Sequence, residues 1–393
     1  MTAPARSSLL EVRCSTAPAR LDALRPEWSA LLDQAGVPSP FLSWEWLATW
    51  RRHFGARRPL RILEARDASG ALAGLLVLCG RPGLGARRWQ LLGNGITGAD
   101  GLDVLARPAE ASAVRAAIAA AALELEGWDA LELEDLPCGS PTVAALRAAA
   151  AARGVRARVE RRFACPGFAV AGSWEAHLRG IRRRETFGRR ARWLARQPGF
   201  RIEVATRPEE AAAAMADFLR LHRLRWAGEG GSYGIPPGAP EAFHLEVAPL
   251  LAARGWLRLY RLLVDGEAIA AVYGLEAGRR FLYYQSGYDP RWSARSPGMV
   301  LVGRTVEDAY ARGLVDYDFL RGEEPYKLDW AADRRETCAV RLRAPSLRAG
   351  TAAAAEEAYR AARRLARRVA PERLWGALQR ARRAREVNAG AAP

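Results

Sequence analysis

The chain has 393 residues, half of them apolar, and a formal net charge of +17. This length suggests two domains, and the charge predicts an anionic partner such as nucleic acid, a phosphorylated substrate, a coenzyme or an acidic membrane surface. No apolar run is long enough to span a bilayer and the first residues lack the apolar core of a signal peptide, so we expect a cytoplasmic protein.

The five cysteines are far apart, and none lies at the Cys-x-x-Cys or Cys/His spacing of a redox or zinc motif. An odd number of scattered cysteines argues against a disulfide framework. We predict no metal site and place these residues in the core or in loops: Cys14, Cys79, Cys138, Cys165 and Cys338.

The first half of the chain alternates strand-like and helix-like segments. Apolar residues recur at helical spacing in residues 18–34, and Ser43 is a suitable N-cap for the next helix. The polar turn 67–70 between two apolar runs predicts a hairpin. In order we expect strand 9–14, helices 18–34 and 43–55, strands 60–65, 72–79 and 89–92, helix 109–126, strand 130–136, helix 142–153, and strands 155–163 and 168–170.

A glycine-rich segment, NGITGADGLD at residues 94–103, precedes the alanine-rich helix 109–126. A glycine loop before a helix can receive phosphate, but this one lacks the Gly-Lys-Ser/Thr of a P-loop and the Gly-x-Gly-x-x-Gly of a dinucleotide site. We therefore interpret it as a surface loop.

The segment HLRGIRRRETFGRRARWLAR, residues 177–196, carries eight arginines and one glutamate. It predicts a basic helix whose apolar residues face inward. Two interpretations stay open: a solvated helix face, or a face that binds phosphate or another acid, because like charges at this density repel unless an anion is nearby.

The second half contains the clearest hairpin, residues 256–264 and 268–275 around the turn Asp265-Gly266. The four histidines of the chain are scattered on predicted helices, so we expect them at the surface or at interfaces and not as a catalytic group. They are His53, His177, His222 and His244. The expected order is strand 200–205, helix 208–226, a Gly/Pro-rich loop 228–240 that could cover a site, helix 243–253, the hairpin, strand 280–288, helix 299–311, strand 315–320 and strand 337–343.

The stretch LVDYDFLRGEEPYKLDW, residues 314–330, is the candidate active edge. Asp316 and Asp318 alternate with bulky apolar residues, which places both aspartates on one strand face. Lys327 is the only lysine in a chain that otherwise uses arginine. Because lysine can release its proton and arginine effectively cannot, Lys327 can serve as an acid, a base or a compact charge, or it can simply lie on a solvated turn.

The two halves have the same order of elements, each ending in an acidic strand and a turn. This order predicts two tandem α/β domains, residues 1–172 and 173–345, followed by a tail over 346–393. The sequence from Pro345 onward carries eleven arginines and four glutamates. A basic helix of this kind can lie on anionic lipid or remain a solvated end.

These features resemble the tandem GNAT-type N-acyltransferases that include the CelD-like proteins of cellulose biosynthesis, and more distantly the Fem-type peptidoglycan aminoacyltransferases. The resemblance rests on IRRRETFGRRARWLARQPGFRIEVAT, on the hairpin and following strand WLRLYRLLVDGEAIAAVYGLEAGRRFLYYQSGYDP, and on DFLRGEEPYKLDW. It covers residues 174–343 well and the first half more weakly, through FLSWEWLATWRRHFG.

The resemblance implies mixed α/β sheets in two GNAT-like domains, with acyl-CoA as co-substrate, no covalently bound cofactor and no metal. The donor would lie between strands 280–288 and 315–320. Its pyrophosphate would lie at the start of helix 299–311, where Ser296 can cap the helix and Pro297 fits its first position. The implied donor-binding residues are Tyr284, Gln285, Arg291, Arg295, Ser296 and Gly298. The usual acyl-CoA signature is Q/R-x-x-G-x-G/A. Residues 295–300, RSPGMV, match it only in part because the last small residue is missing, and this departure argues against ordinary acetyl-CoA use.

The chemistry of amine acylation requires proton removal from the amine and stabilisation of an oxyanion. The resemblance therefore suggests that Asp318 or Asp316 assists deprotonation and that Lys327, in an aromatic-Lys pair with Tyr326, stabilises the charge. The residues expected to bind substrate are Arg183, Trp226, Arg321 and Tyr326. In the first domain, which lacks a lysine, we expect a structural or acceptor-binding role.

The function predicted from this resemblance is transfer of an acyl group, by default acetyl, from CoA to an amine of a cell-envelope or exopolysaccharide precursor. The acceptor would be a small molecule, a sugar or a lipid-linked compound, and the tail could hold the protein at the inner face of the membrane. Two alternatives remain: a Fem-like enzyme that uses aminoacyl-tRNA, favoured by the net charge and the arginine-rich helix, and a non-catalytic module that binds an acidic membrane surface.

Overall fold

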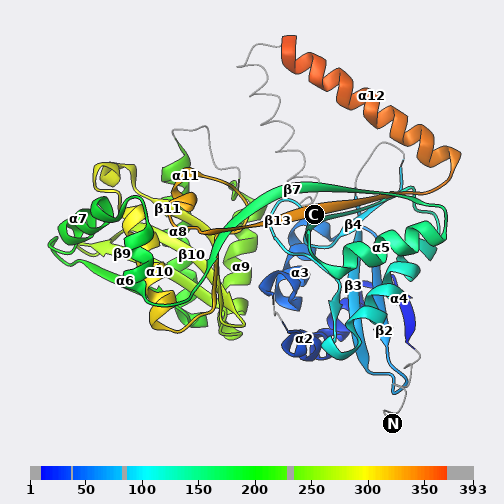
Figure 1. The fold of residues 1–393 in the computed structure, drawn as a ribbon, viewed down its shortest axis with the longest axis horizontal. Helices are drawn as coiled ribbons and strands as arrows, with labels where there is room; N and C mark the ends of the chain where they lie inside the picture. Colours follow the sequence, from blue (N-terminus) through cyan, green and yellow to red (C-terminus); the bar gives the residue numbers. More distant parts are fainter. Residues whose placement is uncertain (1–9, 37–38, 82–85, 228–233, 370–393) are drawn as a thin grey trace.

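The computed structural model describes residues 10–36, 39–81, 86–227 and 234–369, so the predicted loop 228–240 and tail 346–393 lie partly outside it. Within these ranges 13 strands form one mixed sheet in the order β1-β2-β3-β4-β6-β13-β7-β12-β11-β10-β9-β8, with β5 paired to β3. Figure 1 shows two lobes, each with helices around its part of the sheet. The predicted mixed α/β fold is confirmed.

The first lobe follows the expected order of elements. Its Ser43 side chain accepts a hydrogen bond from the Trp46 backbone N–H, as an N-cap should, and Trp46 is fully buried. Its elements are β1 (Glu11–Ser15), α1 (Pro18–Ala23), α2 (Arg25–Gln34), η1 (Pro40–Leu42), α3 (Trp44–Trp50), η2 (Arg51–Gly55), β2 (Leu60–Arg66), β3 (Leu72–Arg81), β4 (Arg88–Leu91), β5 (Leu105–Ala106), η3 (Pro108–Glu110), α4 (Ala111–Glu124), β6 (Ala130–Pro137), α5 (Pro141–Ala152) and β7 (Arg156–Ala169).

The second lobe is built around the hairpin β9–β10, whose strands face helices α8, α9 and α10. Its elements are α6 (Trp174–Gly180), α7 (Arg184–Leu194), β8 (Arg201–Ala205), α8 (Pro208–Ala227), α9 (Ala239–Ala253), β9 (Leu257–Val264), β10 (Glu267–Ala277), β11 (Arg280–Tyr288), η4 (Pro290–Arg295), α10 (Pro297–Ala311), β12 (Asp316–Asp318), α11 (Pro325–Leu328), β13 (Asp333–Arg343) and α12 (Leu347–Val369).

The two lobes exchange strands. β7 leaves the first lobe and pairs with β12 of the second, whereas β13 leaves the second lobe and pairs with β6 of the first. Along their length β7 and β13 pair with each other, and Figure 1 shows both crossing between the lobes. The predicted boundary at residue 172 falls between β7 and α6, so a cut there would remove one strand from the sheet of the second lobe.

Several predicted elements differ from the structure. The predicted helix 18–34 is divided into α1 and α2, and the predicted helix 43–55 is α3 followed by the π-helix η2. Strands 155–163 and 168–170 are one strand, β7, because Gly167 lets the chain pass from β13 to β12: a Cβ there would lie 2.8 Å from the Tyr317 carbonyl oxygen. The basic helix is two helices, α6 and α7, separated after Gly180 by residue Ile181 in an extended conformation. Strand 315–320 is shorter, because Leu320 adopts a left-handed conformation with φ of 56°.

The parallel strands β11 and β12 separate along their length. They pair only at Arg280–Leu282 with Asp316–Asp318, and β11 then continues to Tyr288 with no further pairing to β12. This separation opens the sheet at the centre of the second lobe, beside the loop that follows β12.

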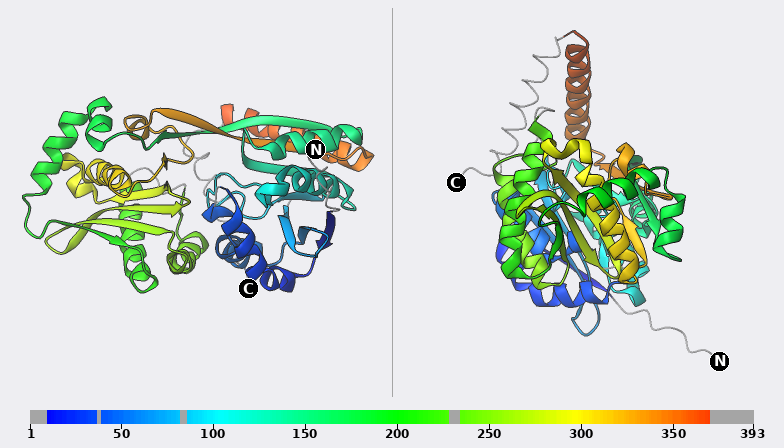
Figure 2. Two further views of the ribbon diagram at one scale, coloured as in Figure 1. Left: turned by 60° about the horizontal axis from the view of Figure 1, so that its bottom comes forward. Right: turned by 90° about the vertical axis from the view of Figure 1, so that its left-hand side faces the viewer.

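The helix α12 stands apart from the body of the protein, as the second view in Figure 2 shows. Leu347 and Leu365 on it are largely exposed, whereas Ala349 is buried. No helix among the described residues has the length and apolar character needed to cross a bilayer.

Candidate active site

A cavity of about 800 Å³, which we name the donor cavity, lies where β11 and β12 separate. Its walls come from β11, the start of α10, the segment 320–330 that contains α11, the end of α8, and the glycine-rich loop 93–101 of the first lobe. Both lobes therefore build it. The first-lobe loop, interpreted from sequence as a surface loop, is one of its walls.

Lys327 lies in the wall of this cavity on the short helix α11. Its side chain is buried, and its Nζ donates a hydrogen bond to the Arg321 carbonyl oxygen at 2.6 Å. Nζ also pairs with Glu324 Oε2 at 3.0 Å, and the Glu324 side chain is half exposed. A buried ammonium held by these two contacts is a fixed positive charge at the cavity wall.

Arg321 joins the two lobes beside Lys327. Its Nε donates to Asp100 Oδ1 at 2.6 Å, its backbone N–H donates to Asp100 Oδ2 at 2.8 Å, and its guanidinium lies 3.2 Å from Asp135. The guanidinium also donates to the Ala99 carbonyl oxygen at 2.7 Å. These contacts hold the loop 93–101 against the segment that carries Lys327.

Tyr284 holds the same loop from β11. Its hydroxyl donates to the Thr97 carbonyl oxygen and lies 3.2 Å from His244 Nε2, so the histidine donates to the tyrosine oxygen. Burial raises the pKa of Tyr284 well above its usual value, so the hydroxyl stays protonated. In the β10–β11 register Tyr273 pairs with Gln285 and Gly274 with Tyr283, which leaves Tyr284 as a bulge residue outside the ladder.

His244 is fully buried, which corrects the expectation that the histidines lie at surfaces or interfaces. It is surrounded by aromatic rings, and burial lowers its pKa to about 3. The unfolded chain therefore binds a proton near pH 6.5 that the folded chain does not bind, so this group stabilises the fold above that pH and its contribution is lost as the pH falls.

We expect that His244→Gln lessens the acid sensitivity of the protein. Between pH 6 and 4.5 the free energy of unfolding should fall by about 2 kcal/mol less in the variant than in the wild type, since one proton uptake is removed. Urea titrations at several pH values measure this, with the partly exposed His53→Gln as the matched control. Equal pH dependence in wild type and His244→Gln would refute the assignment.

The start of α10 faces the donor cavity through Ser296, Pro297 and Gly298. Ser296 is the N-cap residue, but its backbone is left-handed, with φ of 53°, and its side chain makes no capping hydrogen bond, which corrects the predicted cap. A Cβ at Gly298 would lie 3.3 Å from Tyr288 Cδ1, so glycine keeps this helix start close to β11. The N–H groups of the first turn have no intrahelical acceptor and attract anions.

The structure brings most of the predicted site residues to one cavity. The residues that line the donor cavity are Lys327, Tyr284, Gln285, Ser296, Gly298, Arg183, Trp226, Arg321 and Tyr326. Arg291 and Arg295 do not line it: Arg291 pairs with Asp289 and Glu267, and Arg295 lies over the Trp193 ring at 4.0 Å. These two arginines are engaged with their neighbours on and beside η4.

Asp316 and Asp318 are not in the donor cavity. Both lie in an ion-pair cluster in which Arg280 and Arg335 contact each carboxylate, with Arg335 Nη1 2.8 Å from Asp316 Oδ2 and 3.1 Å from Asp318 Oδ2. Burial opposes ionisation of Asp316, but hydrogen bonds from both arginines outweigh it and lower the pKa. Burial raises the pKa of Asp318, whose Oδ1 accepts the Leu320 N–H.

Three carboxylates at the donor cavity escaped the sequence reasoning, and one of them is Asp100, the partner of Arg321. Glu324 lies beside Lys327, and Asp329 pairs with Arg183 at 3.1 Å. The sequence signal was the spacing: Glu324 precedes Lys327 by three residues, which brings side chains together when the segment is helical.

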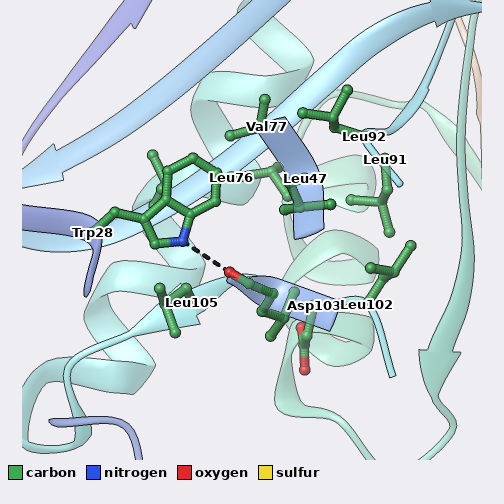
Figure 3. A pocket seen from close by; sticks show the side chains of 11 residues that line it. Trp28, Leu47, Leu76, Val77, Leu91, Leu92, Leu102, Asp103 and Leu105 are labelled. Atoms are coloured by element: carbon green, nitrogen blue, oxygen red, sulfur yellow. Dashed lines mark hydrogen bonds between the residues drawn. The ribbon is translucent and has the colours of Figure 1, made fainter. Parts of the chain in front are cut away.

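A small cavity lies in the core of the first lobe, beside β3 and β4. The cavity there measures about 20 Å³, room for about one water molecule. Figure 3 shows Leu47, Leu76, Leu91 and Leu102 closing around it. The Trp28 Nε1 donates to the Leu42 carbonyl oxygen at 2.8 Å at its edge.

Residues 182–328 match the family model described as an acetyltransferase (GNAT) domain. No curated protein matches the chain in sequence.

Three solved structures share the fold at low sequence identity. FemX is 11% identical with a TM-score of 0.59, over 83% of this chain and 96% of FemX. The C-terminal domain (DUF2156) of a lysylphosphatidylglycerol synthetase candidate from Agrobacterium fabrum is 11% identical with a TM-score of 0.51, over 86% and 96%. A protein of unknown function from Bacteroides thetaiotaomicron is 10% identical with a TM-score of 0.51, over 85% and 100%. Residues 182–328 are therefore similar to a GNAT acetyltransferase domain, and this match supports an acyltransferase as the enzyme class.

Proposed function

We propose that this protein is an N-acyltransferase that moves an acyl group from acyl-CoA to the amine of a small-molecule, sugar or lipid-linked acceptor of the cell envelope or an exopolysaccharide. One observation carries the proposal: the separated strands β11 and β12, the start of α10 and Lys327 all face one cavity of about 800 Å³. A cavity of that size accommodates a coenzyme arm together with an acceptor amine.

The donor would lie along β11. Beyond Leu282 this strand has backbone groups on the β12 side that are free of β12, and an extended pantetheine arm can pair with them. The pyrophosphate would lie at the start of α10, near Ser296 and Gly298, where the helix dipole favours negative charge. Acyl-CoA bound in this way would extend from the start of α10 towards Lys327.

The acylation step needs a base, an oxyanion partner and a leaving thiolate. Glu324, which is half exposed at the cavity wall, is placed to accept the proton of the incoming ammonium. Lys327 and the backbone N–H of the bulge residue Tyr284 would stabilise the oxyanion as the amine attacks the thioester carbonyl. The C–S bond then breaks, and the CoA thiolate takes up the second proton that the nitrogen loses as the amide forms. Asp316 and Asp318, predicted as bases, would support β12 through their ion pairs.

Release of the CoA thiol tests this function. The full-length protein is incubated with acetyl-CoA or longer acyl-CoA donors and with amino sugars, amino acids or phosphoamines, and free thiol is titrated. We expect release that depends on both donor and amine. Folded protein that shows no amine-dependent release with any donor would refute the proposal.

A second candidate, transfer from aminoacyl-tRNA, is favoured by one observation. Arg183, immediately before the basic helix α7, reaches the wall of the donor cavity, and Arg182, Arg184 and Arg189 are exposed beside it. A row of exposed arginines suits a polyphosphate chain. This candidate predicts tRNA binding with a steep salt dependence and no thiol release from CoA donors.

The proposal includes peripheral contact with an anionic membrane through α12 and the residues beyond it. The arginines of this basic segment would attract acidic lipid headgroups. Co-sedimentation of the protein with liposomes of acidic and neutral lipids, with and without residues 346–393, measures this contact.

A further inference from the structure

A second cavity, of about 590 Å³, lies between the lobes, and we name it the acceptor cavity. Asp100 and Leu320 line both cavities, so the two are neighbours across these residues. The first turns of α4 and strands β11 and β13 contribute to its wall. A molecule in the acceptor cavity would therefore lie close to the donor cavity.

Most charged side chains on this wall are neutralised by partners. The ion pairs are Asp318 with Arg335 at 3.1 Å and Arg280 at 3.5 Å, Asp100 with Arg321 at 2.5 Å, and Glu336 with Arg161 at 3.2 Å. These groups are held in place and leave no net charge for a ligand to balance.

Two charged residues of this wall, Arg115 and Asp103, have no ion-pair partner among the described residues. Within the part of the chain that the structure describes, Arg115 has no ion pair or hydrogen bond, and its Nε is buried without a partner. The Asp103 carboxylate accepts hydrogen bonds from the Val104 N–H at 2.7 Å and the Ser140 hydroxyl at 2.5 Å, but no described cation pairs with it. Because buried polar groups in native proteins are nearly always satisfied, the buried Nε of the half-buried Arg115 can receive an anionic group of a ligand in this cavity.

The remaining wall is apolar, with Phe41, Leu105 and Leu282 among its residues. An apolar wall beside a few fixed polar groups is the usual composition of a site for a small organic molecule. One free positive and one free negative charge favour a ligand that carries both signs, because a ligand with several negative charges and no cation would meet the unbalanced Asp103.

We propose that the acceptor cavity binds an amine that also carries a phosphate or carboxylate group, with the anionic group on Arg115. Its amine is directed past Asp100 and Leu320 towards the donor cavity. This inference rests on the proposed function for the identity of the ligand as the acyl acceptor, but the binding site itself does not depend on acyl-CoA.

Binding of three small probes to the full-length protein tests the site. The probes are phosphoethanolamine, which has both groups, ethanolamine, which has only the amine, and ethyl phosphate, which has only the anion. We expect phosphoethanolamine to bind at least tenfold more tightly than either. Arg115→Met should weaken its binding about tenfold, since a charge-assisted contact is lost. The matched control is Arg147→Met on α5, an exposed arginine without an ion pair among the described residues, and it should leave binding within twofold.

Equal binding of the three probes, or an equal effect of Arg115→Met and Arg147→Met, would overturn the proposal. Glucosamine 6-phosphate as a fourth probe separates two sources of the same chemistry: tighter binding than phosphoethanolamine assigns the site to a sugar, and weaker binding assigns it to a lipid headgroup. CoA binding is measured in parallel. If the wild type does not bind CoA but Arg115→Met still weakens phosphoethanolamine binding, the proposed function is refuted and this binding site is retained.

Discussion

Replacing Lys327 by alanine is expected to lower kcat about 100-fold while the KM for acyl-CoA stays within about threefold. The Nζ of Lys327 is a buried, fixed charge at the wall of the donor cavity. Removal of one preorganised group that stabilises an oxyanion typically costs a factor of about 100 to 1,000 in kcat. Steady-state kinetics with varied acyl-CoA separate the effect on kcat from the effect on KM.

Two further variants make this prediction specific. Leu328→Ala removes an exposed neighbour on the same short helix and should leave kcat within about twofold. Lys327→Arg keeps the charge but changes its shape, so it should restore only part of the activity. A kcat of Lys327→Ala within twofold of the wild type, in a protein with unchanged circular dichroism, would show that the lysine has no role in the chemistry.

Replacing Arg321 by alanine is expected to lower the free energy of unfolding by about 3 kcal/mol. The substitution removes the partner of Asp100 and Asp135, which lie on the first lobe and are buried. Breaking a buried ion pair by deleting one member leaves an uncompensated charge, at a cost of about 3 to 5 kcal/mol, and the partial exposure of Arg321 places the expected value at the lower end. Urea unfolding monitored by tryptophan fluorescence gives the value.

The control for Arg321 is an exposed arginine in the same region. Arg334 pairs with Glu323, and both side chains are largely exposed, so Arg334→Ala should change stability by less than about 0.5 kcal/mol. Adding Asp100→Asn to Arg321→Ala should recover part of the loss, because one stranded charge is then removed. Similar stability of Arg321→Ala and Arg334→Ala would mean that the contact between the lobes contributes little.

The fold was largely predictable from local pattern. The hairpin β9–β10, the Ser43 N-cap and the order of strands and helices follow from period-two and helical spacing, which depend on neighbouring residues. The exchange of β7 and β13 was not predictable. These strand partners are residues at least 147 positions apart in the sequence, and Pro166-Gly167 looked locally like the end of a strand.

The candidate site was predictable where one short segment supplies it. Arg321, Tyr326 and Lys327 lie within seven residues, so their shared cavity follows from the turn that joins them. The contribution of the first lobe was not predictable, because Thr97 and Asp100 reach the cavity only through contacts with Tyr284 and Arg321. The alternating pattern correctly placed Asp316 and Asp318 on one face of the strand. It contains no information on the partners of that face, which are Arg280 and Arg335.

Calorimetric titration of the full-length protein with CoA tests whether the donor cavity binds the proposed donor. We predict one CoA bound per chain, because the donor cavity lies where β11 and β12 separate and reaches the start of α10. The expected Kd is in the micromolar range, about 10 µM, which corresponds to about −7 kcal/mol. Absence of CoA binding up to about 1 mM, together with tight and salt-dependent binding of tRNA by the same protein, would contradict acyl-CoA as the donor and favour an aminoacyl donor.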